Sequence, residues 1–254
     1  MSAAARSEAP LNPTEKWVVN FDDAQCVASR NYGTPQKPLY LVLKAPPLGK
    51  VMQIAVMRAA AGGADEQRDA RLTIDERPPL DVSLLAYTSK STQRRVNMVN
   101  LTIEQFAPMR QALSLAIASK GLHERFALTS MDGLLKLMDS CVADLVKVWN
   151  VNEGLGPTTT LRSRAMGNVA SFFSSDDYPR DALYGDNEGK VRFVILVKED
   201  GTVADCTLTE TSGAAALDAQ TCAVILKRAK FTPAVGLDGK PAKDALSGTL
   251  RWKL

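Results

Sequence analysis

Residues 190–254 change their hydrophobic period twice, and this restricts the fold more than any other feature of the chain. Apolar side chains alternate along Val191–Val197 and again after Asp200-Gly201, where glycine accepts the positive φ of a tight hairpin. From Leu217 they recur every three to four residues, as on one face of an amphipathic helix. The final run, Leu246–Leu254, alternates again. These periods predict a three-stranded antiparallel sheet covered by one helix, with at least one open edge strand.

Short motifs stand in a fixed order around these elements. They are Tyr178-Pro179 before the first strand, Asp200-Gly201-Thr202-Val203 at the hairpin, Thr211-Ser212-Gly213 before the helix and Phe231-Thr232-Pro233-Ala234 after it. In this order they resemble the C-terminal domain of the TonB family, over residues 177–254. The resemblance implies a periplasmic module that binds the TonB box, a segment near the N-terminus of outer-membrane TonB-dependent transporters, by strand addition.

The resemblance also implies where the partner binds. The family's pairing edge corresponds to the last strand, its Tyr-Pro segment to Tyr178 and Pro179, and its basic helix end to Arg228 and Lys230. The edge residues are Ser247, Thr249, Leu250, Arg251 and Lys253. The two cations would pair with an acidic residue of the box or the plug. The alternative is that they form only the solvated, dipole-stabilised end of the helix.

Residues 16–150 predict a β-rich domain closed by helices, so the whole chain is expected to be α+β. Turn signals separate short runs of β-branched and aromatic residues, as in an antiparallel sheet or sandwich. The predicted strands are Trp17–Phe21, Leu39–Leu43, Val51–Val56, Arg71–Ile74, Val82–Tyr87, Arg95–Val99 and Glu124–Leu128. A helix is predicted over Ile103–Lys120. A second begins after Ser130 as N-cap, with the apolar stripe Leu134, Met138, Cys141, Leu145 and Val148.

This half also resembles, faintly, the invasion-associated locus B family. The likeness lies in an aromatic-led first strand, in Cys26-Val27-Ala28-Ser29-Arg30 and in a late cysteine on a helix. It implies no ligand and no catalytic residue.

Two segments lack a hydrophobic period. Residues 1–15 predict a disordered N-terminus, and residues 151–176, with Gly154, Gly156 and Pro157, predict a linker. Met1–Arg6 has no hydrophobic region, so it is not an intact signal peptide, and we expect a signal or anchor to have been removed.

The four cysteines indicate two disulfides. Cys206 lies on the predicted inner face of a strand, and Cys222 on the apolar stripe that continues through Ile225, Leu226 and Ala229. Cys141 faces the sheet that carries Cys26, which makes Cys26–Cys141 the second pair. The alternative is buried free thiols. Disulfides would favour an oxidising compartment, which for a TonB-like module is the periplasm.

Composition and motifs favour a binding protein over an enzyme. Apolar content is 45%, charged content 23% and net charge +3, which is too small to argue for nucleic acid. His123 is the single histidine and no Cys-x-x-Cys pair occurs, so we expect neither metal nor cofactor. No converging acid, base or nucleophile is apparent, and we expect no catalysis.

The resemblance and the composition predict two alternative functions. The first is TonB-box binding, with energy transduction for nutrient uptake if an anchor engages inner-membrane motor proteins. A folded domain stands where the family has its Pro-rich spacer, which argues against energy transduction more than against transporter binding. The alternative function is a soluble periplasmic adaptor that uses the module for protein association, including a homodimer through the sheet edge.

Overall fold

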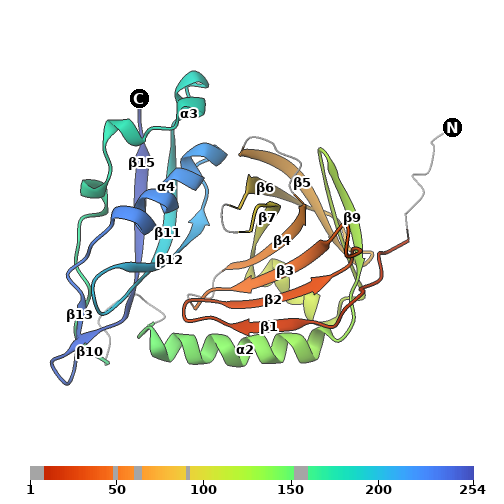
Figure 1. The fold of residues 1–254 in the computed structure, drawn as a ribbon, viewed down its shortest axis with the longest axis horizontal. Helices are drawn as coiled ribbons and strands as arrows, with labels where there is room; N and C mark the ends of the chain where they lie inside the picture. Colours follow the sequence, from red (N-terminus) through yellow and green to blue (C-terminus); the bar gives the residue numbers. More distant parts are fainter. Residues whose placement is uncertain (1–8, 48–50, 60–64, 90–91, 152–159) are drawn as a thin grey trace.

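In the computed structural model, which describes residues 9–47, 51–59, 65–89, 92–151 and 160–254, the chain forms two main sheets of unequal size (Figure 1). The larger is an antiparallel half-barrel of nine strands in the order β1-β2-β3-β4-β7-β6-β5-β8-β9. The strands are β1 Val18–Phe21, β2 Cys26–Asn31, β3 Leu39–Ala45, β4 Val51–Ala59, β5 Glu66–Ile74, β6 Leu80–Thr88, β7 Arg94–Thr102, β8 Ser114–Ser119 and β9 Leu122–Ala127. The predicted α+β class is confirmed.

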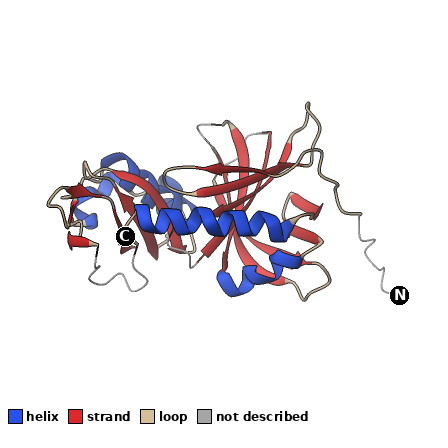
Figure 2. Ribbon diagram, turned by 90° about the horizontal axis from the view of Figure 1, so that it is seen from below, coloured by secondary structure: helices blue, strands red, loops and turns tan. Residues whose placement is uncertain are grey.

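Helix α2 (Met131–Val148) lies along the half-barrel (Figure 2) and supplies part of its core. Leu134, Met138, Cys141 and Leu145 are buried as the stripe predicts, whereas Val148 is 48% exposed. Ser130 precedes the helix with a left-handed φ of 61°, and its side chain makes no capping hydrogen bond. Ser130 is thus the N-cap residue, as predicted, but its left-handed backbone differs from the extended one that a side-chain cap requires.

The predicted helix over residues 103–120 is also wrong. Only α1 (Ile103–Phe106) is α-helical; a 3₁₀ turn, η1 (Ala107–Gln111), and then strand β8 follow. Pro108 has no backbone N–H and its ring crowds the preceding turn, so an α-helix does not continue through it. The later part of this segment alternates with period two and pairs with β5 and β9.

A disulfide joins the half-barrel to its helix. Cys26 on β2 and Cys141 on α2 are bonded, with their Cα atoms 6.1 Å apart. Both side chains are buried in the core. The predicted pairing is confirmed.

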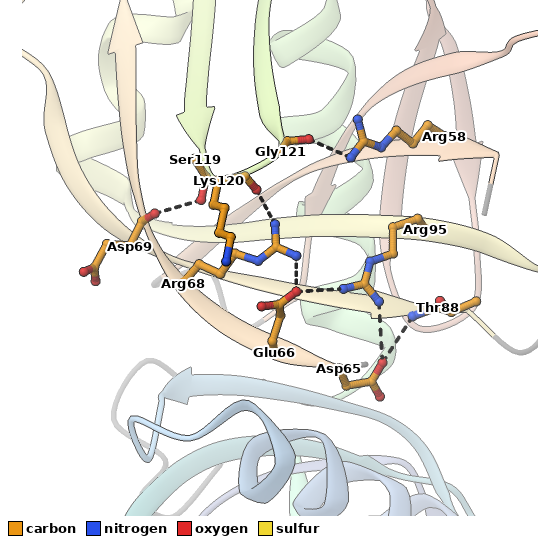
Figure 3. A network of polar contacts seen from close by, with 10 residues as sticks. All are labelled: Arg58, Asp65, Glu66, Arg68, Asp69, Thr88, Arg95, Ser119, Lys120 and Gly121. Atoms are coloured by element: carbon orange, nitrogen blue, oxygen red, sulfur yellow. Dashed lines mark hydrogen bonds and ion pairs between the residues drawn. The ribbon is translucent and has the colours of Figure 1, made fainter. Parts of the chain in front are cut away.

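Charged side chains tie together the strands at one end of the half-barrel (Figure 3). Arg95 is 5% exposed, and its guanidinium lies 3.6 Å from the carboxylate of Glu66, which also contacts Arg68. Arg58 donates to the carbonyl of Gly121 at 2.8 Å. These contacts join β4, β5, β7 and the β8–β9 turn. The charged side chains therefore stabilise the half-barrel.

The smaller sheet has the order β12-β11-β15, with β11 spanning Gly189–Val197, β12 Val203–Glu210 and β15 Asp244–Trp252. The predicted hairpin turn is confirmed: Gly201 has a φ of +82°, and a Cβ there would lie 2.1 Å from the carbonyl oxygen of Phe231. Helix α4 (Ala215–Arg228) packs on one face. The remaining short elements are β10 Leu161–Ser163, η2 Val169–Phe172, η3 Ser175–Asp177, α3 Arg180–Tyr184, β13 Ala234–Gly236 and β14 Pro241–Ala242.

A second disulfide links α4 to the sheet. Cys206 and Cys222 are bonded with their Cα atoms 5.5 Å apart, as predicted. The predicted stripe of the helix is correct at Ile225 but wrong at Leu226, which is 46% exposed. Val224 is buried instead, so the buried side of the helix is rotated from the expected stripe.

The two sheets meet on the face of the smaller sheet that lies opposite α4. Leu196 and Ala245 belong to the same apolar core as the half-barrel. The Asn150 side chain donates to the carbonyl of Lys243 at 2.8 Å, and the Lys243 ammonium lies 4.9 Å from the Trp149 ring centroid. The chain therefore packs its C-terminal unit directly against its N-terminal one.

The predicted boundaries between domains stay predictions. Residues 1–8 of the expected disordered terminus and 152–159 of the expected linker lie outside the described residues. Leu11 forms a parallel bridge with Phe126 of β9. Phe172 and Phe173 pack on the core of the C-terminal unit. Within the described ranges, no helix is both long and apolar enough to cross a membrane.

Candidate functional site

Strand β15 forms an edge of the smaller sheet. It pairs antiparallel with β11 along its whole length, from Asp244 opposite Val197 to Trp252 opposite Gly189. No other strand in the described part of the chain pairs with its outer side. An edge of this kind presents backbone donors and acceptors to an incoming strand.

Ala245 shows which peptide groups of β15 point outward. Its N–H donates to Asp244 Oδ1 at 2.8 Å and its carbonyl accepts from Arg164, so both groups turn away from β11. Peptide groups alternate in direction along a strand, so every second residue shares this orientation. These residues are Ser247, Thr249 and Arg251. Their backbone groups have no hydrogen-bond partner among the residues that the structure describes.

The opposite edge of the sheet faces the half-barrel. The side-chain amide of Asn100 donates to the carbonyl of Leu208 on β12 at 3.4 Å. Beside this contact, burial raises the pKa of Asp205 on β12 and lowers that of Lys44 on β3, and attraction between the two charges opposes both shifts. The half-barrel therefore lies against β12, and among the described residues β15 is the edge left open.

A buried carboxylate fixes the start of β15. Asp244 is fully buried and accepts from Arg164 Nε, the Ala165 N–H and the Ala245 N–H, each at 2.8 Å. This network ties residues 164–165 to the strand and occupies the peptide groups of Ala245. Sequence reasoning missed it, since an ion pair across 80 residues has no local signal.

Aromatic side chains surround the other end of β15. Trp252 is buried, and its indole N–H donates to Thr221 Oγ1 on α4 at 2.9 Å. The rings of Tyr178 and Phe173 lie edge-on to it, at 5.3 and 5.5 Å between centroids. Pro179 follows as the residue before α3. The structure thus brings the Tyr-Pro segment beside the candidate edge.

The two predicted cations at the helix end have different surroundings. Arg228 forms an ion pair with Asp177. Burial opposes ionisation of Asp177, but hydrogen bonds from Ser174 and the ion pair outweigh it and lower the pKa of the carboxyl. Lys230 is exposed and bridges through its backbone to Thr202. A partner carboxylate would therefore compete with Asp177 for Arg228, whereas Lys230 is accessible.

The side chains of β15 divide between two faces. Leu250 is 9% exposed and faces the core under α4, while the side chains of Ser247, Thr249 and Arg251 are exposed on the other face. Lys253 is exposed just beyond the strand. Of the predicted edge residues, Leu250 thus contributes to the core, and the other four are accessible to a partner.

The exposed face beside the edge is positively charged. Arg251 lies opposite Lys190, and Thr249 opposite Arg192. Glu210 is 3.6 Å from Lys190 and 2.8 Å from Arg192, so one carboxylate neutralises only part of this charge. Nowhere in the described ranges do three or more His, Cys, Asp or Glu side chains group as metal ligands would.

Comparison with known proteins identifies part of the chain. Residues 174–254 match the family described as Gram-negative bacterial TonB protein C-terminal. This part of the chain is therefore similar to the C-terminal domain of TonB proteins. No curated protein matches the chain. The resemblance of the N-terminal half to the invasion-associated locus B family finds no support.

Proposed function

We propose that this protein binds outer-membrane TonB-dependent transporters in the periplasm, with the transporter's TonB box added as a strand to β15. The observation that carries the proposal is the asymmetry of the sheet: β12 is covered, while Ser247, Thr249 and Arg251 of β15 present free peptide groups. The match to the TonB C-terminal domain supports the partner, and the two disulfides are consistent with the periplasm.

In this proposal the edge residues have separate roles. The backbones of Ser247, Thr249 and Arg251 form the ladder with the box, while Leu250 and Trp252 hold the strand on the core. The Tyr178-Pro179 segment and Lys230 contact the plug beside the box. Arg228 contributes only where a partner carboxylate displaces Asp177.

The proposal is tested with proline at the edge. Thr249→Pro removes an outward N–H and places a ring where the new strand would lie, so affinity for TonB-box peptides should fall about tenfold or more. The matched control is Thr249→Ala, which removes the same side chain but keeps the N–H and should bind as the wild type does. Isothermal titration with box peptides from the host's own transporters gives the affinities.

Unfolding curves must show that both variants remain folded. Equal binding by wild type and folded Thr249→Pro would refute pairing at this edge, and failure of every box peptide to bind the wild type would refute the transporter as partner.

A soluble adaptor is the second candidate, favoured by the contact between the two units. Because Leu196 and Ala245 share the core of the half-barrel, the TonB-like unit is held against a folded domain. In this reading the half-barrel binds a secreted or envelope partner, and β15 associates with a protein or with a second copy of the chain. Energy transduction would instead need a membrane anchor and motor proteins. Sedimentation of the wild type and Thr249→Pro distinguishes the homodimer, which the proline would dissociate.

A further inference from the structure

A cavity of about 340 Å³ lies beside the start of the open edge. Its apolar lining comes from β11, from β15, from η2 with the segment before it, and from the segment after α4. The lining includes the side chains of Phe193, Ile195, Leu246, Phe231, Met166 and Val169. Ser247, whose peptide groups point outward, is also part of the lining. The cavity and the free backbone groups therefore adjoin one another.

Two glycines let aromatic rings pack closely in the cavity lining. A Cβ at Gly248 would lie 2.5 Å from the ring of Phe193, and one at Gly167 would lie 2.6 Å from the ring of Phe231. Any larger residue at either position would force these rings to move. The rings therefore lie directly against the backbone of β15 and of the segment opposite it.

The outer wall of the cavity is held in place before any ligand binds. The N–H of Met166 donates to the carbonyl of Thr232 at 3.0 Å, and the N–H of Thr232 donates back at 2.8 Å. Met166 nevertheless leaves 64% of its surface exposed, and Leu246 is only half-buried. Exposed apolar surface on a fixed wall suits a complementary apolar side chain.

The register of an added strand directs every second side chain to the face of the sheet that carries this cavity. A new strand lies about 4.8 Å from β15, and a residue opposite Leu246 or Gly248 directs its side chain to the same face as theirs. That face carries Phe193 and Ile195 of the lining. Because Ala245 is already bonded to Asp244 and Arg164, pairing stops at Ser247, so the cavity meets the side chain at one end of the added strand.

The other face of the added strand meets positive charge. Its side chains would lie beside Ser247, Thr249 and Arg251, and Arg251 makes no ion pair with any residue in the described ranges. Acidic or polar side chains complement this face, whereas apolar ones complement the cavity. An added strand that fits this edge therefore has apolar side chains on one face and polar or acidic side chains on the other.

We propose that the cavity is a specificity pocket, which takes one aliphatic side chain from an extended partner segment whose opposite face is polar or acidic. This rests on the proposed strand addition and adds the chemical requirement that decides which segments bind.

The test is a double-mutant cycle between the protein and the TonB-box peptide that binds it. Met166→Asn makes the cavity wall polar at an exposed position and keeps the backbone hydrogen bonds, and Met166→Leu is the matched apolar control. Each aliphatic residue of the peptide is replaced in turn by serine. We expect Met166→Asn to lower the affinity for the parent peptide on the order of tenfold. Met166→Leu should leave this affinity unchanged.

One peptide position should also be coupled to the cavity. Replacing the peptide residue at this position by serine should weaken binding to the wild-type protein. The same replacement should change the affinity for Met166→Asn very little. If both Met166 variants bind every peptide as the wild type does, while Thr249→Pro abolishes binding, the pocket is refuted and strand addition stands. If no box peptide binds the wild type, the proposed binding of the TonB box is refuted, and the pocket proposal that rests on it is refuted as well.

Discussion

Replacing Asp244 by alanine should lower the free energy of unfolding by about 3–5 kcal/mol. The carboxylate is fully buried and accepts hydrogen bonds from Arg164 and from the N–H groups of Ala165 and Ala245. Its removal leaves the Arg164 guanidinium, about a fifth exposed, without this counter-charge, and leaves the two N–H groups without this acceptor. Urea unfolding with both disulfides intact measures the loss.

Asp181→Ala is the control for this change. Asp181 is an exposed carboxylate in the first turn of α3, so its replacement should change stability by no more than about 0.5 kcal/mol. Equal stability of the two variants would show that the Asp244 network does not hold the start of β15.

Removing the Cys26–Cys141 disulfide should have an effect of similar size. Its cysteines are 115 residues apart, and closing so long a loop restricts the unfolded chain by about 4–5 kcal/mol on the chain-entropy argument. The Cys206–Cys222 disulfide spans only 16 residues, for which the same argument gives about 3 kcal/mol. The double variant Cys26→Ala, Cys141→Ala should therefore unfold at lower urea than Cys206→Ala, Cys222→Ala.

The second pair serves as the internal control, because each double variant also loses two sulfur atoms from an apolar layer. If the short-loop variant is the less stable of the two, the long disulfide does not constrain the unfolded chain as proposed.

The C-terminal unit was predictable because its elements are signalled by local pattern. The alternation along β11 and β15 and the Asp200-Gly201 turn each act over a few residues. Both disulfides followed from which face each cysteine occupies. Period and turn chemistry thus gave the sheet, its helix and its open edge.

The errors arose where tertiary packing or a single residue overrides the local pattern. A helix was predicted over residues 103–120, but Pro108 interrupts it, and Leu115 and Ile117 alternate into the half-barrel core. Leu226 fits a helical stripe, yet α4 buries Val224 and Ile225 and leaves Leu226 exposed.

The edge strand was predicted in position, whereas the direction of its peptide groups was not, and partner binding at this edge stays a prediction. The sequence placed the edge at residues 247–253 but could not decide which N–H groups point outward. That follows from the contact of Ala245 with Asp244 and Arg164. The covering of β12 by Asn100 and the pairing of Arg228 with Asp177 also join residues far apart in the chain, so no local pattern reveals them.

Hydrogen exchange of individual amides along β15 tests strand addition most directly. In the free protein the inward N–H groups of Gly248 and Leu250 should exchange slowly, because they bond to β11, while those of Ser247, Thr249 and Arg251 should exchange fast. A saturating TonB-box peptide should slow exchange at the three outward amides and leave the inward ones as they were. A peptide that binds without protecting any of the three outward amides would contradict the account.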